Sequence, residues 1–153
     1  MDSKLIADTR TKVNLLMDPR TGIDLALDEQ KLAPLAELLD TTKLSKKRKV
    51  AILGSYMLLY LGLTRHEELE VPENEERTRR LLAGDYLFGG YIRWLVQFEE
   101  RELLTHLSPV HKKIQIGLAS GLSLPLALAE LDAGFRTFVE RYAQGQHRTR
   151  RPQ

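Results

Sequence analysis

Cysteine is missing from all 153 residues of this chain. Disulfide bridges, cysteine-ligated zinc and iron–sulfur clusters all need thiol groups, so the sequence excludes them. The chain also lacks a thiol nucleophile, a GxSxG elbow, a P-loop and a GxGxxG loop. These absences argue against a self-sufficient enzyme of the corresponding kinds. Because a chain without cysteine is compatible with a reducing compartment, we expect a cytoplasmic location.

Long apolar runs are also scarce. The longest, Val50–Leu63, has fourteen residues, whereas a helix that crosses a bilayer needs about 20 predominantly apolar residues. The amino-terminal residues mix acids and bases through their apolar positions, unlike a secretory signal. We therefore expect an uncleaved chain with no membrane span, in which Val50–Leu63 forms a helix that is buried nearly all round.

Neither sign of charge dominates. The formal net charge is +2, from 23 basic and 21 acidic residues. A nucleic-acid-binding helical domain would use the basic clusters Lys46–Lys49 and Arg148–Arg151, but the low net charge argues against it, so we expect no nucleic acid partner. Basic residues oppose the dipole at the start of a helix, and we expect Lys46–Lys49 to face solvent or an acidic partner.

Apolar residues recur with helical spacing throughout, and no stretch alternates as a half-buried strand does. We therefore predict an all-α fold, with one compact multi-helix domain over residues 1–143 and a basic, disordered tail over residues 144–153. Proline, serine and glycine positions suggest the helix boundaries. The first expected helix covers residues 3–17, and the second has Pro34 in its first turn. The third is capped by Ser45 or Thr42 and carries Val50–Leu63, and the fourth covers residues 75–106. The last segment, from Ser108-Pro109 to Tyr142, is either one kinked helix or two helices meeting near residues 120–125.

Histidines and glutamates after the most apolar segment raise the question of a metal or acid–base site. His66 stands beside Glu67 and Glu68. A charged segment between two apolar helices is more often a solvated connector. His106 and His111 are five residues apart, which is not the i, i+4 spacing of two imidazoles on one helical face. We therefore predict no metal site in this chain.

Asp85 lies in the middle of an apolar segment. A carboxylate that is buried, ionised and unpaired is strongly destabilising, so Asp85 either has a hydrogen-bonding partner in the core or lies at an interface. The sequence leaves both readings open. Arg93, eight residues further on, is about two turns away and too far for a direct pair within one helix.

Two stretches resemble a known family. The segment LLYLGLTRHEELE ends at Glu70, and RRLLAGDYLFGGYI begins at Arg79 after a short charged segment. Together they resemble two consecutive helices of the trans-polyprenyl diphosphate synthases. They are most similar to the small subunit, component 1, of bacterial two-component heptaprenyl and hexaprenyl diphosphate synthases. The resemblance covers residues 50–96, is weak around residues 111–114 and is absent at the termini, and it implies a truncated isoprenoid synthase helical bundle.

The chain departs from the pattern of the catalytic members of that family, which hold magnesium ions through two aspartate-rich motifs. It contains no Asp-Asp pair. Glu67-Glu68 stand at the matching place, Val71 stands where a third ligand is expected, and the second motif is missing. The resemblance therefore implies no catalytic residue, metal or cofactor in this chain, and Mg²⁺ is expected in a catalytic partner subunit.

The resemblance implies a heterodimer with a larger catalytic polyprenyl diphosphate synthase subunit that bears the aspartate-rich motifs. That complex extends farnesyl diphosphate with isopentenyl diphosphate to the hexaprenyl or heptaprenyl chain of menaquinone. This chain would supply an apolar wall, with the growing prenyl chain at the interface. The expected partner-interface residues are Leu59, Leu63, Leu81, Leu82, Gly84, Asp85, Tyr86, Gly89 and Gly90, and the expected chain-length wall is Phe88, Tyr91 and Trp94.

A second interpretation stays open. A stand-alone helical adaptor or regulatory protein that binds a partner helix in an apolar groove would account for the same glycines and apolar helices. Such a protein would be a stable monomer, indifferent to any prenyl synthase.

Overall fold

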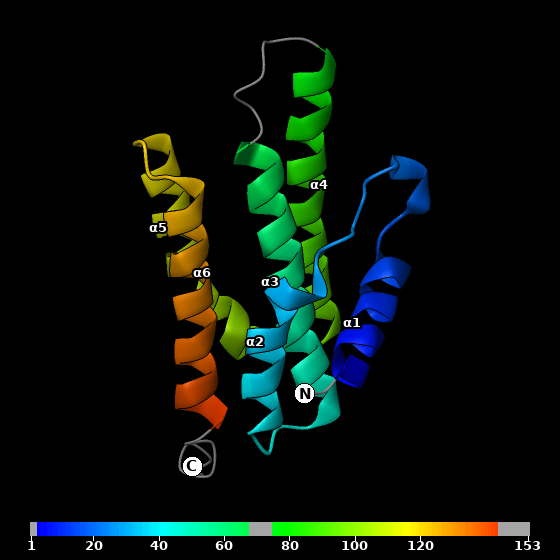
Figure 1. Ribbon diagram of the computed structural model, residues 1–153, viewed down its shortest axis with the longest axis vertical. Helices are drawn as coiled ribbons and strands as arrows, with labels where there is room; N and C mark the ends of the chain where they lie inside the picture. The colour runs from blue at the N-terminus through cyan, green and yellow to red at the C-terminus, as the bar shows by residue number, and fades with distance from the viewer. Residues whose placement is uncertain (1–2, 68–74, 144–153) are drawn as a thin grey trace.

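Two long helices, α3 (Lys46–Glu67) and α4 (Glu75–Gln97), run side by side in opposite directions in the middle of the fold (Figure 1). They belong to a computed structural model that describes residues 3–67 and 75–143. All regular secondary structure in these two ranges is helical, which confirms the predicted all-α class. Within the same ranges, no helix combines the length and apolarity that a bilayer crossing requires. The predicted tail lies outside the described residues.

The remaining helices pack around this pair. α1 (Ser3–Leu16) lies along α3, and α2 (Glu29–Asp40) contacts α1, α3 and α6. α5 (Arg101–Ala119) and α6 (Leu124–Phe138) form a second antiparallel pair, on the left of Figure 1, and a π-helical turn at Val139–Ala143 follows. Because α3 touches α1, α2, α4 and α6, its residues 50–63 are buried apart from half-buried Tyr60, as the sequence predicts.

Two glycines of α3 admit aromatic rings from α4. The indole of Trp94 lies on Gly54 so closely that an added Cβ would be 2.1 Å from the ring atom Cζ2. The indole N–H donates a 2.8 Å hydrogen bond to the carbonyl of Ala51. Closer to the start of α4, Phe88 lies over Gly62, where an added Cβ would be 3.2 Å from the ring atom Cε1. These glycines therefore set both the spacing and the rotation of α4 against α3.

The chain turns between α4 and α5 at residues 98–100, so the prediction of one helix over residues 75–106 was wrong. Glu99 has a φ of 57°, in the left-handed region, and the N–H of Glu100 donates a 2.9 Å hydrogen bond to the carbonyl of Leu95. The predicted helix start at Ser108-Pro109 was also wrong, because α5 runs through both residues. Pro109 has no N–H to donate to the carbonyl of Thr105, four residues earlier, and both residues are exposed, so α5 tolerates the proline on its solvent side.

Two of the four basic residues at the start of α3, Lys46 and Arg48, pair with acidic residues of this chain. Arg48 donates two 2.8 Å hydrogen bonds from Nε and Nη2 to the carboxylate of Glu100, a side chain that is only 4% exposed. This bidentate pair holds the pKa of Arg48 above its usual range, because hydrogen bonding favours the charged guanidinium. Lys46 pairs with Asp8 of α1 and lowers the pKa of that carboxyl. Ser45 caps the helix as predicted, accepting a 3.2 Å hydrogen bond from the N–H of Arg48.

Two other helix boundaries bear on the predictions: one differs from what was expected, and one decides between the two alternatives left open. α2 begins at Glu29, capped by the side chain of Asp28, so Pro34 lies inside the helix and not in its first turn. Between α5 and α6 the backbone reverses at Gly121, whose φ is 103°, and Ser123 caps α6. The segment left open in the sequence is therefore two helices.

An alanine substitution at Gly54 tests the ring–glycine packing. We expect Gly54→Ala to lower the free energy of unfolding by about 1–3 kcal/mol, because the new methyl group displaces the Trp94 ring. Thr105→Ala is the control, since Thr105 is exposed on α5 and lies outside the α4 face. Its unfolding free energy should be unchanged or rise by up to about 0.7 kcal/mol, because alanine is the better helix former. Urea denaturation measures both, and equal effects would contradict the packing described.

Arg48→Met tests the ion pair at the corner between α4 and α5. The variant leaves the carboxylate of Glu100 buried without its partner, and we expect the free energy of unfolding to fall by about 3 kcal/mol. Lys47→Met, at the exposed neighbouring position, should change it by less than about 0.5 kcal/mol. The double variant Arg48→Met/Glu100→Met should recover part of the loss, because no buried charge remains. A single Arg48→Met variant as stable as the parent would show that the pair contributes nothing.

Candidate functional site

Helix α4 presents two different faces. Its inward face packs buried Leu87, Tyr91 and Trp94 into the core. The outward face, which we call the α4 face, consists of Thr78, Leu82, Asp85, Gly89, Ile92 and Val96, all exposed. The side chains of Leu82, Ile92 and Val96 are 61%, 44% and 65% exposed. Large apolar side chains gathered on one helix face are typical of a contact surface.

The predicted partner-interface residues fall on both sides of this division. Leu81, Leu82, Asp85 and Gly89 are exposed. Leu59, Leu63, Gly84 and Gly90 are buried inside the chain, and Tyr86 is half-buried. Gly90, for example, faces Met17, whose sulfur would lie 3.0 Å from an added Cβ. In this structure, only the exposed group lies where another protein could touch it directly.

The three predicted chain-length residues point into the bundle. Phe88 is half-buried, lies over Gly62 and packs at a tilt of 56° against the ring of His111, with centroids 4.6 Å apart. Tyr91 is 2% exposed, and its buried hydroxyl has no hydrogen-bond partner among the described residues. Burial raises the pKa of this phenol above its ordinary value. Together with buried Trp94, these side chains fill the space between α4 and its neighbours and hold the helices apart.

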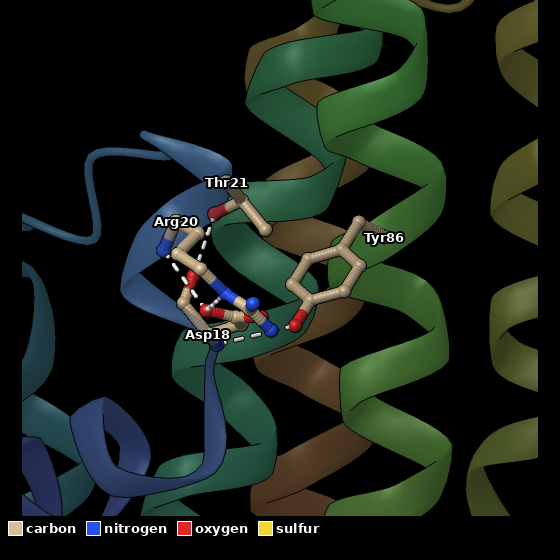
Figure 2. Close-up of polar contacts among 4 residues, drawn as sticks. All are labelled: Asp18, Arg20, Thr21 and Tyr86. Carbon is tan, nitrogen blue, oxygen red and sulfur yellow. Dashed lines mark hydrogen bonds and ion pairs between the residues drawn. The ribbon is translucent and has the colours of Figure 1, made fainter.

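Tyr86 ties α4 to the segment that follows α1 (Figure 2). Its hydroxyl accepts a 3.2 Å hydrogen bond from the backbone N–H of Asp18, and the hydroxyl of Thr21 donates a 2.9 Å bond to the Asp18 carbonyl. The guanidinium of Arg20 holds the pKa of the Asp18 carboxyl below its usual range by hydrogen bonding to it. On the other side, the guanidinium of Arg93 lies 5.5 Å from the centroid of the Tyr86 ring. Tyr86 thus positions a cation at the edge of the α4 face.

The two histidines whose side chains are described, His106 and His111, pack against aromatic rings of this chain. The Nε2 atom of His106 lies 3.0 Å from the carbonyl of Gly134, and its ring faces Phe138. The ring of His111 packs on α4, as described above. The side chains of His66 and of the pair Glu67-Glu68 lie outside the described ones. Among the residues that are described, no group of three or more histidine, aspartate or glutamate side chains is arranged to hold a metal ion.

The sequence reasoning missed several members of this surface. Ile92 and Val96 complete the α4 face, and their spacing from Thr78 onward, in alternate steps of four and three residues, was a signal that could have found them. The sequence also gave no signal for Leu15 of α1, which is 79% exposed and belongs to a second surface. It lines a groove between α1, the start of α3 and the end of α4, in which Leu16, Val50, Trp94 and Phe98 are accompanied by Lys12 and Lys47.

No family model, no curated protein and no solved structure matches this chain. The resemblance to the small subunits of prenyl diphosphate synthases therefore rests on residues 50–96 by themselves. What the described residues establish is an all-helical fold whose helix α4 carries the LAGDY segment and an outward apolar face.

Proposed function

We propose that this chain is the non-catalytic small subunit of a heterodimeric long-chain trans-polyprenyl diphosphate synthase, of the hexaprenyl or heptaprenyl type, that serves menaquinone side-chain synthesis. The observation that supports the proposal is the division of α4. The helix with the LAGDY segment packs inward on α3 and carries exposed Leu82, Ile92 and Val96 outward. A subunit that works only by docking on a catalytic partner needs such a face.

In this proposal all bond-making chemistry belongs to the larger subunit. Its two aspartate-rich motifs hold Mg²⁺ and the allylic diphosphate, which ionises before the alkene of isopentenyl diphosphate attacks and a proton is lost. The present chain supplies a partner surface centred on the α4 face, which covers an apolar tunnel for the growing product. Asp85, exposed in the middle of that face, is proposed to bind across the interface, so Asp85→Ala should weaken subunit association.

Phe88, Tyr91 and Trp94 would act on product length indirectly. They are packed against α3 and α5, so they set where α4 lies and hence how deep the covered tunnel is. A bulky residue behind the wall of the tunnel fixes where the wall lies. The wall then stops elongation at the point where the growing prenyl chain would overlap it.

A condensation assay tests the proposed division of labour. Farnesyl diphosphate, labelled isopentenyl diphosphate and Mg²⁺ are given to this chain, to the aspartate-rich prenyl synthase of the same organism, and to their mixture. We expect long-chain product only in the mixture. The Leu82→Arg variant should lower its formation at least about tenfold, because the interface would lose an apolar contact and would have to accommodate a long charged side chain in its place. Leu126→Arg makes the same change at 58% exposed Leu126 of α6 and should leave the rate unchanged.

Two outcomes of this assay would overturn the proposal. If the aspartate-rich synthase makes the same product at the same rate without this chain, or if this chain turns over alone, the division of labour is wrong. The adaptor interpretation would then take its place.

Phe88→Ala tests the indirect control of product length. Loss of the ring that separates α4 from α3 and α5 should deepen the tunnel and shift the product of the complex to longer chains. Tyr91→Phe is the control, because it removes only a hydroxyl without a described partner and keeps the ring. Thin-layer or mass-spectrometric analysis gives the distribution. An unchanged distribution from a Phe88→Ala complex that still assembles would count against this role.

A further inference from the structure

A groove lies between α1 and the central helix pair, and α1 is on the opposite side of that pair from α5 and α6 (Figure 1). We call it the α1 groove, and it has a volume of about 850 Å³. Its α1 wall consists of Asp8, Thr11, Lys12, Leu15 and Leu16, whose helical spacing places them on one face of α1. The start of α3 and the end of α4 form the other wall. A volume of this size is typical of sites for small molecules.

The α1 groove is separate from the α4 face. The residues of α4 that line it are Trp94, Gln97 and Phe98. Trp94 is two residues from both Ile92 and Val96, and residues two apart in an α-helix point about 200° away from one another. The groove and the α4 face are therefore on opposite sides of α4, and a molecule in the groove leaves the α4 face open.

The polarity of the α1 groove changes along its length. At one end, Lys46 of α3 pairs with Asp8 of α1 at 2.5 Å, and Lys47 follows Lys46. Toward the end of α1 the wall becomes apolar, with half-buried Leu16 and with Leu15, which is 79% exposed. Lys12 lies one turn from each of these two parts of α1. Basic side chains therefore lie at one end and in the middle, and apolar side chains at the other end.

The charges in the groove are mainly positive. Its described lining includes the lysines Lys12, Lys46 and Lys47 and a single acidic residue, Asp8. The carboxylate of Asp8 is already engaged by Lys46 and by Lys4, whose Nζ is 3.5 Å away. Neither Lys12 nor Lys47 forms an ion pair with another described side chain. Two cations therefore remain beside an apolar surface, and their complement is an anion that carries an apolar chain.

We propose that the α1 groove binds a small anionic amphiphile, a molecule with an anionic head such as a phosphate and a single apolar chain. The head is held by Lys12 and Lys47, and the chain lies along Leu15 and Leu16. The volume favours a single chain over a partner helix, since three helical turns with their side chains occupy about 1,250 Å³. The inference does not depend on the proposed function, because it concerns a groove outside the α4 face.

Alkyl phosphates test whether head and chain both contribute. Isothermal titration calorimetry compares octyl phosphate with decyl phosphate, each kept below its micelle-forming concentration. Two further methylenes in an apolar groove should tighten binding at least about fivefold. Inorganic phosphate, which has no chain, and decyl maltoside, which has no charge, should each bind at least about tenfold more weakly than decyl phosphate. Equal affinities of octyl and decyl phosphate, or of decyl phosphate and decyl maltoside, would overturn the proposal.

Tryptophan fluorescence tests the place of binding. Trp94 lines the groove and is the only tryptophan of the chain. Bromine quenches an indole at short range, so 10-bromodecyl phosphate should quench this fluorescence with a midpoint at its calorimetric Kd. Decyl phosphate without bromine is the control for quenching by the chain itself. Binding of the brominated probe without quenching would place its chain elsewhere and overturn the proposal.

Charge reversal tests the two free lysines. Lys12→Glu/Lys47→Glu should weaken the binding of decyl phosphate at least about tenfold. Lys31→Glu/Lys112→Glu makes the same change in net charge at exposed positions of α2 and α5, and should leave the affinity within about twofold. Circular dichroism confirms that both variants fold. Equal affinities of the two double variants would overturn the proposal.

Leu15→Asn tests the apolar end. Leu15 is exposed, so the variant should fold normally, and decyl phosphate should bind about threefold more weakly or worse. Leu126→Asn, at a 58% exposed leucine of α6, is the matched control and should bind like the parent. Equal binding by the two variants would contradict the placement of the chain.

Vesicles distinguish a molecule in the groove from a bilayer surface. We expect decyl phosphate to bind in solution with no membrane present. Sedimentation of the chain with phosphatidylglycerol vesicles, without any binding of the soluble probes, would overturn the proposal in favour of a membrane contact. All of these measurements use the chain without any prenyl synthase, so they can fail while the condensation assay succeeds, and the reverse.

Discussion

The seating of the Trp94 indole on Gly54 is the contact on which the rest of the arrangement depends. It fixes the distance between α3 and α4, and the hydrogen bond to the carbonyl of Ala51 fixes the depth of the ring. Phe88 over Gly62 repeats the contact further along the pair. Two such contacts on one helix determine its rotation about its own axis as well as its position. The residues on the opposite side of α4 must therefore face outward, whatever their polarity.

The Arg48–Glu100 pair limits this arrangement at one end. The carboxylate of Glu100 is 4% exposed, so leaving it without the guanidinium would be strongly destabilising, and the corner that carries it is held against the start of α3. Glu99 takes a left-handed conformation at that corner, and α4 ends there. The outward apolar face consequently stops at Val96, one turn before the corner. The length of the α4 face is thus limited by an ion pair that lies outside it.

Local signals in the sequence predicted much of the fold, and their limits explain the errors. Helical periodicity gave the all-α class and the buried run Val50–Leu63, and the cap at Ser45 follows from side-chain chemistry within one turn. The corner at Glu100 depends on Arg48, a partner 52 residues away, so no local signal marks it. The Ser108-Pro109 signal instead placed the start of this helix too far along the chain. The rotation of α4 needs the same kind of distant information, because large apolar residues occur almost all round that helix. The predicted interface set therefore mixed buried Leu59 and Gly90 with exposed Leu82 and Gly89, and it lacked Ile92 and Val96.

The α4 face is one helix wide, so it admits one partner helix at a time. The apolar positions discriminate little between partners, because any well-packed apolar row fits Leu82, Ile92 and Val96. The charges discriminate more, since a partner helix must offer a cation near Asp85 and an anion near Arg93. The ring of Tyr86 restricts the partner helices further, because Arg93 lies over it and its guanidinium is thereby held at the edge of the α4 face. In a surface of this kind the two charges would supply the specificity, while the apolar residues would supply the affinity.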